Sequence, residues 1–406
     1  MKPIKLIFTL LTFVLLIFTG SCQKEADLPV NLSHALHLTD SIKIDGEQRV
    51  FIWIYADHPE YKPAKAPGEG IACADDVGRF LEVLEQAILD YNKKEFVDLS
   101  KKMTRFLLYM EKEGQWYNFI FADGSINKGH INSKLDFGFW AVRGLRGLAA
   151  SYRILQKHAP QSGLMDSIKR SIHRSEKYYT NEALASPDDG YLLKQAPDMT
   201  SELLLVLTKL HETGDYNYKS EIQNIVQSLV KNQFKKQGHE LNGMYFCWKN
   251  IWHSWGNNQA LALMKAYQIT GNQEILGSVK RWADNFLRFV IDNNFPANIE
   301  IQDKAKYKIE IYPQIAYGIT SMYRGIVELN KITNQEKYKD QAERIFGWYE
   351  GENLAGVQMY DPETGRCFDG INKENVNKNS GAESTIECLL ALFTQHKYLK
   401  RQEWQK

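Results

Sequence analysis

Carboxylates recur in this sequence where apolar helical segments begin and in the loops before them. Asp136 and Glu383 each open such a segment, Asp76 lies at another helix start, and Asp123 lies in a loop between aromatic residues. Two carboxylates in one cleft can act as general acid and general base when burial or a neighbouring charge keeps one of them protonated. We therefore predict Asp136 and Glu383 as a catalytic pair, with Asp76 and Asp123 as the carboxylates that raise the pKa of a partner.

Helix capping is the alternative role for these acidic side chains. A carboxylate at a helix start can accept hydrogen bonds from free backbone N–H groups and stabilise the helix by about 1 kcal/mol. This alternative stays open for Glu383, which follows the small residues Gly381 and Ala382. Asp136 fits a site better, because its spacing to Trp140 and Arg143 would place these side chains on roughly one helical face.

Aromatic and amide side chains are dense around these carboxylates. The stretch 114–149 and the segment WHSWGNN at 252–258 combine stacking rings with hydrogen-bonding groups, a combination that connecting loops normally lack. The alternatives are that Trp116 and one tryptophan of the second segment anchor the core, and that His253 is a hydrogen-bonded structural residue. The predicted substrate-binding residues are Trp116, Tyr117, Asn118, Trp140, Arg143, Trp252, His253, Trp255, Asn257 and Tyr312.

The amino terminus has the order of a secretory signal. Two lysines precede an apolar run at 6–18 that is short for a membrane span. The small residues before Cys22 resemble a bacterial lipobox, which implies a lipoprotein anchored to a membrane of the bacterial cell envelope. We expect residues 1–21 to be removed, Cys22 to carry the lipid, and residues 22–44 to tether a domain at 45–406. An ordinary cleaved signal with an incidental cysteine is the alternative.

Charge and cysteine usage exclude several classes of function. The net charge is +1 with acidic and basic residues interspersed, so the sequence lacks the electrostatic footprint of a nucleic-acid-binding protein. The 9 Trp and 21 Tyr residues fit a protein that stacks on sugar rings better than one that binds phosphate. Four cysteines, Cys73, Cys247, Cys367 and Cys388, show no CxxC spacing, which predicts buried free thiols and no metal or cofactor.

Helical hairpins dominate the sequence after a short strand-like run at 50–55. Helical segments begin near Asp75, Asp136, Thr200, Ser254, Tyr312 and Gly381. The turns inside the first five hairpins are short, whereas the links between hairpins, at 112–133, 181–197, 238–253, 294–311 and 352–379, are long. The first helix of each hairpin is also the more apolar. We therefore expect an inner ring of first helices, with the long links gathered at one end around a single cleft.

This arrangement is similar to the six-hairpin glycosidase-like, or (α/α)6, superfamily of carbohydrate-active enzymes. The resemblance covers about 45–393 and is carried by EGIACADDVGR at 69–79, Asp123-Gly124, YDPETGRCFDGIN at 360–372 and NSGAESTIECLLAL at 379–392. It implies an all-α fold, an (α/α)6 toroid of helical hairpins with a short N-terminal strand-containing segment. Hydrolases, lyases and sugar epimerases share such toroids, so the resemblance leaves the reaction open.

Three functions are compatible with these observations. The carboxylate-rich mouth favours a lipid-anchored glycoside hydrolase that acts on envelope or imported oligosaccharides. A uronate-directed polysaccharide lyase or a sugar epimerase is the second hypothesis, in which Arg143, His253 and Tyr312 would supply a base and neutralise a carboxylate. The third is a non-catalytic glycan-binding lipoprotein. In each case the expected partners are an oligosaccharide or polysaccharide and, through the lipid, a membrane.

Overall fold

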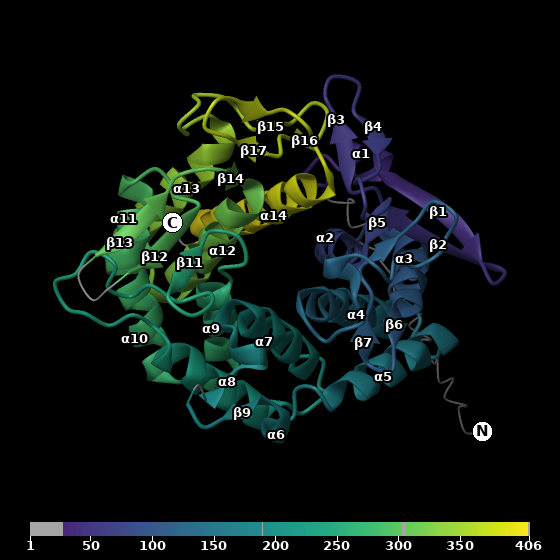
Figure 1. Cartoon of the computed structure of the whole chain (residues 1–406), viewed down its shortest axis with the longest axis horizontal. Helices are drawn as coiled ribbons and strands as arrows, with labels where there is room; N and C mark the ends of the chain where they lie inside the picture. Colours follow the sequence, from purple (N-terminus) through teal and green to yellow (C-terminus); the bar gives the residue numbers. More distant parts are fainter. Residues whose placement is uncertain (1–26, 189, 303–305, 405–406) are drawn as a thin grey trace, which may run out of the picture.

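The chain folds into two concentric layers of helices. In the computed structural model, which describes residues 27–188, 190–302 and 306–404, six helices form an inner ring. They are α2 (Ala74–Tyr91), α4 (Phe139–His158), α7 (Pro197–His211), α9 (Gln259–Thr270), α12 (Ala316–Thr333) and α14 (Ala382–Trp404). Each contacts the next and α14 contacts α2, so the ring closes around a central axis (Figure 1). The predicted all-α toroid is confirmed.

A second layer of helices covers this ring from outside. It consists of α3 (Val97–Met110), α5 (Gly163–Glu176), α8 (Lys219–Lys231), α10 (Gln273–Arg281), the π-helical segment η4 (Trp282–Leu287), α11 (Arg288–Asp292) and α13 (Glu336–Glu350). These helices bury one stripe of side chains, such as Met165, Ile168 and Ile172 on α5. The inner helices are covered on more sides, and every residue from Ala316 to Tyr323 of α12 is buried. The predicted division into inner and outer helices is therefore confirmed.

Short turns join inner to outer helices at one end of the toroid. The helices α2, α9 and α12 stop at Asn92, Gly271 and Asn334, which have left-handed φ angles of 58°, 64° and 47°. Glycine and asparagine adopt this conformation at low cost and end helices for that reason. The turns inside these hairpins are short, as the sequence predicted.

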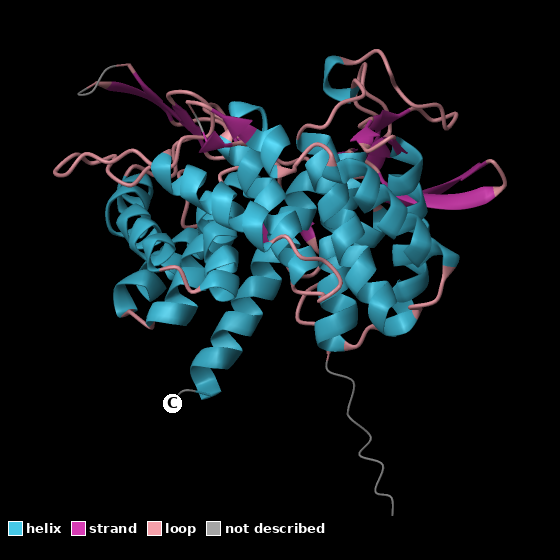
Figure 2. Cartoon of the chain, turned by 90° about the horizontal axis from the view of Figure 1, so that it is seen from below, coloured by secondary structure: helices cyan, strands magenta, loops and turns pink. Residues whose placement is uncertain are grey.

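The long links lie at the opposite end, where they pair into small antiparallel sheets (Figure 2). The three-stranded sheets are β11 (Ile251–His253) with β12 (Asn298–Ile301) and β13 (Tyr307–Glu310), and β14 (Gln314–Ile315) with β17 (Gly370–Ile371) and β18 (Val376–Asn377). The remaining pairs are β1 (Thr39–Ile44) with β2 (Glu47–Ile52), β3 (Tyr55–Asp57) with β4 (Lys62–Ala64), β5 (Ala72–Cys73) with β8 (Phe119–Ile120), β6 (Glu111–Lys112) with β7 (Gln115–Trp116), β9 (Ala185–Ser186) with β10 (Gly190–Tyr191), and β15 (Tyr360–Asp361) with β16 (Arg366–Cys367). Strands β5, β7, β14 and β16 contact the inner helices α2, α4, α12 and α14, whereas β2 and β10 contact mainly the outer helices α3 and α8.

The segment before β2 is folded onto the toroid. The short helix α1 (Ser33–His37) contacts α14, and β1 follows it directly. Val30 and Leu32, just before α1, are buried in the hydrophobic core. The predicted tether at 22–44 is therefore wrong from Val30 onward, because these apolar side chains gain more from packing than from solvent.

The predicted signal peptide at 1–21 and the predicted lipid attachment at Cys22 lie outside the described residues, which begin at residue 27. Along the described chain no helix has the length and apolar character needed to cross a membrane. The four other cysteines are buried free thiols, as predicted: Cys73, Cys247, Cys367 and Cys388.

Two glycines bring α2 and α4 into close contact below the long links. A Cβ atom on Gly78 would lie 2.3 Å from the Arg143 carbonyl oxygen, and one on Gly147 would lie 2.6 Å from the Gly78 Cα atom. Larger residues would push the backbones apart, since only glycine lets them approach this far. The contact places the first turns of α2 beside Arg143.

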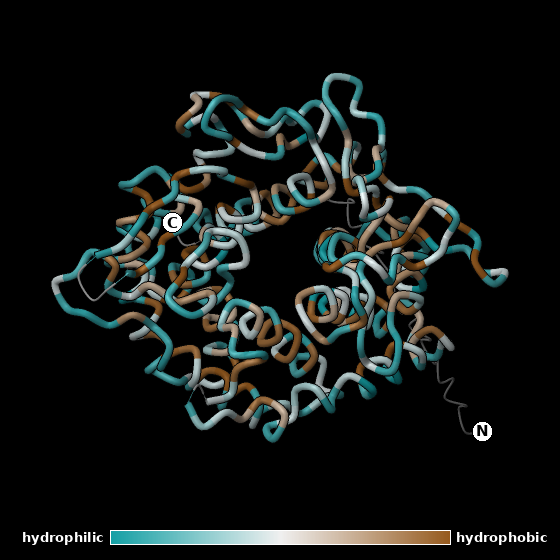
Figure 3. Tube along the Cα trace, in the orientation of Figure 1, coloured by the Kyte–Doolittle hydropathy of each residue, from teal (hydrophilic) through white to brown (hydrophobic). Residues whose placement is uncertain are grey.

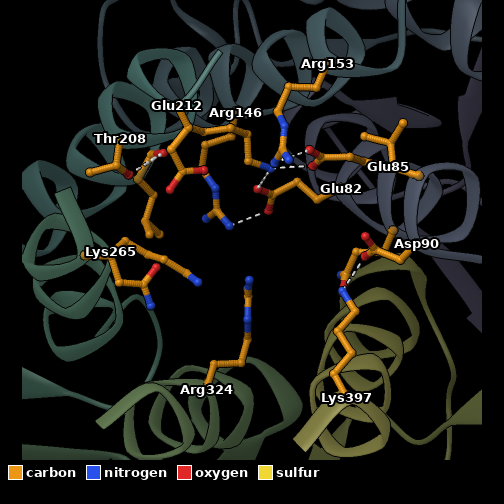
Figure 4. Close-up of a pocket in the computed structure, with 15 residues that line it drawn as sticks. Glu82, Glu85, Asp90, Arg146, Arg153, Thr208, Glu212, Lys265, Arg324 and Lys397 are labelled. Atoms are coloured by element: carbon orange, nitrogen blue, oxygen red, sulfur yellow. Dashed lines mark hydrogen bonds and ion pairs between the residues drawn. The ribbon is translucent and has the colours of Figure 1, made fainter. Parts of the chain in front are cut away.

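A charged cavity of about 330 Å³ lies on the axis, lined by the middle and carboxyl-terminal parts of the inner helices (Figure 4). Lys209 Nζ lies 2.8 Å from Glu82 Oε1 and 2.6 Å from Glu85 Oε2. Arg146 is ion-paired with Glu82 and Glu202. No aromatic side chain of the described residues lines this cavity. We interpret it as an ion-pair network that joins the inner helices.

Candidate active site

A cleft opens between the long links, over the amino-terminal ends of the inner helices. Its volume of about 520 Å³ lies within the roughly 300–1,000 Å³ typical of small-ligand pockets. The first turns of α2, α4, α12 and α14 line it, together with link residues such as Tyr55, Glu69 and Asn118. Carboxylates, guanidinium groups and aromatic rings thus meet at the end of the toroid where the loop lengths predicted a site.

Arg79 joins two carboxylates from opposite ends of the chain in this cleft. Its Nη1 atom donates to Glu383 Oε2 at 2.7 Å and lies 3.5 Å from Asp76 Oδ1. The Cys73 thiol donates to Asp76 Oδ2 at 3.1 Å, so each oxygen of Asp76 has a partner. Asp76 is 4% exposed, whereas the side chain of Glu383 is 44% exposed. The two carboxylates therefore share a cation but differ in their access to water.

Buried carboxylates beside Arg79 hold their protons tightly. Burial raises the pKa of Asp76 from 3.8 to about 6, although the positive charge of Arg79 opposes this rise and the negative charge of Glu383 adds to it. Burial likewise raises the pKa of Glu387, one helical turn after Glu383, from 4.5 to about 7 against the opposing charge of Arg79. A carboxyl group with a pKa near 6 can give or take a proton at neutral pH, which suits acid–base catalysis.

A second arginine, Arg143 on α4, is held by a chain of hydrogen bonds. Its Nη1 atom lies 3.3 Å from Asp75 Oδ2, and its Nη2 atom donates to the Tyr317 hydroxyl at 2.9 Å. Tyr317 in turn donates to Glu202 Oε1 at 2.6 Å. The centre of the Tyr317 ring lies 4.7 Å from the Arg79 guanidinium and 5.2 Å from that of Arg143. Two cations are thus held side by side at the cleft.

Asp75 offers an acceptor that the protein leaves unused. Its Oδ2 atom contacts Arg143, but its buried Oδ1 atom has no hydrogen-bond partner among the described residues. Leaving a buried polar atom unpaired costs about 1–3 kcal/mol. Asp75 lines the cleft, but this oxygen atom is covered by the protein.

Aromatic rings form one wall of the cleft. Trp255 is exposed and lies 6.3 Å from Phe139, measured between ring centroids. Behind Trp255 the His253 ring stacks at 3.6 Å, and Trp140 donates from Nε1 to the Trp116 carbonyl oxygen at 2.7 Å. Exposed rings that are fixed by buried neighbours are suited to stack on the apolar face of a sugar ring.

The structure separates Asp136 from its predicted catalytic partner. Helix α4 begins at Phe139, so Asp136 precedes the helix and does not share a helical face with Trp140 and Arg143. Its carboxylate is ion-paired with Lys194, and Asp136 does not line the cleft. The predicted placement of Asp136 is wrong because the helix starts three residues later than its sequence pattern indicates.

Asp123 lies in an exposed turn and does not line the cleft. Its Oδ1 atom accepts hydrogen bonds from the Ser125 N–H at 2.9 Å and the Ser125 hydroxyl at 2.7 Å. These bonds lower the pKa of Asp123, which is the opposite of what a partner in proton transfer needs. Of the predicted acidic residues, the structure brings only Asp76 and Glu383 together.

The predicted substrate-binding residues divide between the cleft, its surroundings and the core. Those that line the cleft, as predicted, are Asn118, Trp140, Arg143 and Trp255. Those that lie outside its lining are Tyr117, His253, Asn257 and Tyr312. Asn257, for example, is buried and donates its side-chain amide to the Ser254 carbonyl oxygen. Direct contact with a ligand in this cleft is therefore not supported for the second group.

Trp116 and Trp252 belong to the core. They are 0% and 1% exposed, so the prediction that they bind substrate is wrong and the alternative, anchoring of the loops, is correct. Trp116 packs against Gly144, where a Cβ atom would lie 2.5 Å from the indole ring. Trp252 packs against Phe286 at 5.1 Å between ring centroids. Both rings thus contribute apolar burial below the links rather than a stacking platform.

The sequence prediction omits three residues that organise the site: Asp75, Arg79 and Tyr317. Asp75 lies in the first turn of α2 but does not cap it, because the Cys73 sulfur is the group that accepts the Asp76 N–H, at 3.4 Å. Arg79 had a usable signal, since it follows Asp76 by three residues and so lies on the same helical face. Tyr317 had no usable signal in the sequence, because it reaches the two arginines only when the ring closes.

Separate replacement of Trp255 and Trp116 tests the division between cleft and core. We expect Trp255→Ala to weaken oligosaccharide binding by about 0.5–1.5 kcal/mol, the size of a stacking contact, with little change in stability. We expect Trp116→Ala to lower the free energy of unfolding by about 3–5 kcal/mol, because it empties a packed core. Calorimetric titration and urea denaturation measure the two effects. A large loss of stability in both variants with unchanged binding would place Trp255 in the core as well.

Comparison with known proteins relates this toroid to solved structures. The sequence matches no protein-family model and no curated protein. A cellobiose 2-epimerase from Bacillus thermoamylovorans is similar with a TM-score of 0.63 and 15% identity, over 90% of this chain and 96% of the epimerase. A D-mannose isomerase has a TM-score of 0.59 and 12% identity, over 91% and 95% of the two chains. A family 76 glycoside hydrolase from a bovine Bacteroides thetaiotaomicron strain has a TM-score of 0.52 and 14% identity, over 89% and 75%.

These similarities show that the fold is an (α/α)6 toroid. The similarity extends over nearly the whole length of the epimerase and the isomerase, so it concerns the entire toroid and not one hairpin. Proteins with this fold carry out different reactions, and identities of this size show shared architecture alone. The choice of reaction therefore depends on the side chains in the cleft.

Proposed function

We propose that the protein is a carbohydrate-active enzyme, and specifically a glycoside hydrolase that uses Asp76 and Glu383 as its two carboxylates. The contrast between these residues supports the proposal: Asp76 is buried with a pKa raised to about 6, and Glu383 is partly exposed and ion-paired with Arg79 at 2.7 Å. Hydrolysis of a glycosidic bond needs one carboxyl group that keeps a proton and one that is ionised. This pair meets both requirements in one cleft.

In the proposed mechanism, Asp76 donates a proton to the leaving glycosidic oxygen, and ionised Glu383 acts from the other side of the bond. Glu383 either deprotonates a water molecule or attacks the anomeric carbon, which are the two established uses of a second carboxylate. Arg79 contacts both groups, so its charge stabilises Asp76 once the proton has left. The exposed ring of Trp255 would hold the sugar in place by stacking.

A sugar epimerase or isomerase is the second candidate. The toroid is more similar to the epimerase and the isomerase than to the hydrolase, which favours this candidate. The side chains in the cleft favour an epimerase or isomerase less than they favour a hydrolase. No histidine among the described residues lines the cleft, and both ring nitrogens of nearby His253 are occupied, by Asp198 and by the Trp255 carbonyl oxygen. Removal of a carbon-bound proton would then depend on Asp76.

Incubation with a panel of oligosaccharides and polysaccharides distinguishes these functions. A hydrolase releases new reducing ends, and a lyase yields unsaturated products that absorb ultraviolet light. An epimerase changes the sugar composition without releasing ends, and a binding protein changes nothing. We expect new reducing ends that the double variant Asp76→Asn/Glu383→Gln does not release. A changed sugar composition without new reducing ends would contradict the hydrolase proposal and support an epimerase or isomerase.

The proposal includes attachment to the bacterial cell envelope through a lipid on Cys22. Its support is the sequence of residues 1–22, in which an apolar run and small residues precede the cysteine. Acyl chains stabilise membrane binding by about 0.8 kcal/mol per buried CH₂ group, so they can anchor a protein without a spanning helix. We expect Cys22→Ser to move the protein from the membrane fraction to the soluble fraction. A variant that stays with membranes after a high-salt wash would contradict the lipid anchor.

A further inference from the structure

A buried cluster of metal-ligating side chains lies directly behind the aromatic wall of the cleft. It contains Asp198 near the start of α7, Cys247 in the link before α9, and His253 at the end of β11. All three residues are buried, and a carboxylate oxygen, the sulfur and a ring nitrogen all lie within 4.8 Å of one another. The mechanism proposed above uses none of them. The cluster therefore needs an explanation of its own.

The other polar atoms of His253 and Asp198 are occupied by bonds that point away from the cluster. His253 Nδ1 is bonded to the Trp255 carbonyl oxygen, which can only accept, so Nδ1 carries a hydrogen and Nε2 faces the cluster. Asp198 Oδ1 accepts the Met199 N–H at 2.7 Å, which leaves Oδ2 facing His253. Histidines that bind metals usually donate their second N–H to a carbonyl or carboxylate in this way.

The sulfur of Cys247 has N–H donors around it. The His253 backbone nitrogen lies 3.5 Å from Sγ, and the Gln259 side-chain nitrogen lies 3.8 Å from it. Such donors stabilise a thiolate, which is the form of cysteine that binds metals. In the protonated form, the thiol donates to the His253 carbonyl oxygen at 3.4 Å. Binding of a metal releases this proton to solvent.

We propose that Asp198, Cys247 and His253 bind one Zn²⁺ ion. In a tetrahedral zinc site, nitrogen and oxygen ligands at their usual bond lengths are about 3.3 Å apart. His253 Nε2 and Asp198 Oδ2 are 3.2 Å apart, which matches this separation. The sulfur lies within 4.8 Å of both atoms, and it must come to about 3.6 Å from each of them in a tetrahedral site. Thiolate and imidazole ligands suit Zn²⁺, whereas Mg²⁺ and Ca²⁺ prefer oxygen ligands.

The ion has a structural role in this position. Asp198 belongs to the inner ring, whereas Cys247 and His253 belong to a long link, so the metal ties the link to the ring. His253 stacks on Trp255 at 3.6 Å between centroids, and Trp255 lines the cleft. The metal therefore fixes the orientation of the stacking platform without touching the substrate. Three protein ligands leave one tetrahedral position for water.

Metal titration of the full-length protein tests the proposal. Bound metals are first removed with a chelator, and the protein is then titrated with Zn²⁺ and, separately, with Co²⁺. We expect one equivalent of either ion and a Tm that rises with the Zn²⁺ concentration. We expect the Co²⁺ form to show the strong visible absorption of a tetrahedral site and a sulfur-to-cobalt band in the near ultraviolet. These measurements do not depend on which reaction the cleft catalyses.

Variants assign the bound ion to the cluster. We expect Cys247→Ser and His253→Gln each to weaken metal affinity at least about tenfold. Cys388→Ala is the matched control, because it removes a buried thiol outside the cluster and should leave the affinity unchanged. Unchanged affinity in Cys247→Ser would overturn the proposal, and so would a folded wild-type protein that binds no ion or whose Co²⁺ form lacks the sulfur band. If Cys247→Ser does not fold, the wild-type Co²⁺ spectrum decides.

Discussion

Asp76→Asn and Glu383→Gln are each expected to lower the turnover of the cleaved glycan at least about a hundredfold. Both substitutions keep the shape of the side chain but remove its acid–base chemistry. Asp76→Asn removes the proton donor, and Glu383→Gln removes the charge that Arg79 contacts at 2.7 Å. Initial rates of reducing-end release measure the loss. Asp136→Asn is the matched control, since it removes a carboxylate that pairs with Lys194 outside the cleft lining and should leave turnover nearly unchanged.

The pH dependence of turnover provides a second test of Asp76. Burial raises its pKa to about 6, so the proton-donating form declines above that pH, and turnover should fall as the pH rises through 6. Asp76→Asn should lack this limb of the profile. A wild-type profile that is flat across pH 6, or an equal loss of turnover in Asp136→Asn, would exclude Asp76 and Glu383 as the pair.

The raised pKa of Asp76 also determines how the stability of the protein changes with pH. The folded state binds the Asp76 proton more tightly than the unfolded chain, whose pKa is 3.8. The contribution of protonated Asp76 to the free energy of unfolding is therefore fully present below about pH 4 and is lost as the pH rises through about 6. Asp76→Asn removes the buried charge, so we expect the free energy of unfolding at pH 7 to be retained in that variant. Its loss of turnover can then be assigned to chemistry.

Arg146→Met is expected to lower the free energy of unfolding by about 3–5 kcal/mol at pH 7. Arg146 is buried between Glu82 and Glu202 and is ion-paired with both. Burial alone would raise the pKa of Glu202, but the charges of Arg146 and Arg143, together with the hydrogen bonds from Tyr317 and Asn258, outweigh it and lower that pKa to about 2. Removal of the guanidinium leaves two carboxylates in the centre of the toroid with too little positive charge. Urea denaturation measures the loss.

Lys397→Met is the control for Arg146→Met. Lys397 and Asp90 form an ion pair whose side chains are 35% and 45% exposed, and such pairs contribute less than about 1 kcal/mol. The loss in Arg146→Met should also shrink when the pH is lowered to about 5, because carboxylates without their cation regain a raised pKa and take up protons. Equal small losses in the two variants would show that the charged cavity does not stabilise the ring.

The toroid could be predicted from the sequence because its signals are local. Helix stops such as Asn92 and Gly271 mark short turns, and long links precede the first helices. A long link before each inner helix after the first and a short turn after each of the first five leave one arrangement, in which all the links meet at one end. The position of the cleft follows from this pattern without any knowledge of side-chain contacts.

The composition of the site could be predicted only in part, because it depends on where helices begin and on close packing. Gly138 precedes the first turn of α4, which leaves Asp136 before the helix and outside the cleft. Trp116 is buried because Gly144 leaves room for its ring, and the aromatic density of the loop does not reveal this. The juxtaposition of Asp198, Cys247 and His253 could not be predicted for a related reason, since Asp198 and Cys247 are distant in sequence and meet only in the folded ring.

The contact between Arg79 and Glu383 joins residues that are 304 positions apart. Arg79 lies on the first helix of the inner ring and Glu383 on the last, so the ring closes through the site itself (Figure 1). When the chain is synthesised, α14 leaves the ribosome after the other inner helices, and until it docks Asp76 and Arg79 face solvent without Glu383. The proposed pair of Asp76 and Glu383 is therefore complete only once α14 has docked. A ligand that contacts both Arg79 and Glu383 would link α2 to α14 and slow the opening of the whole ring.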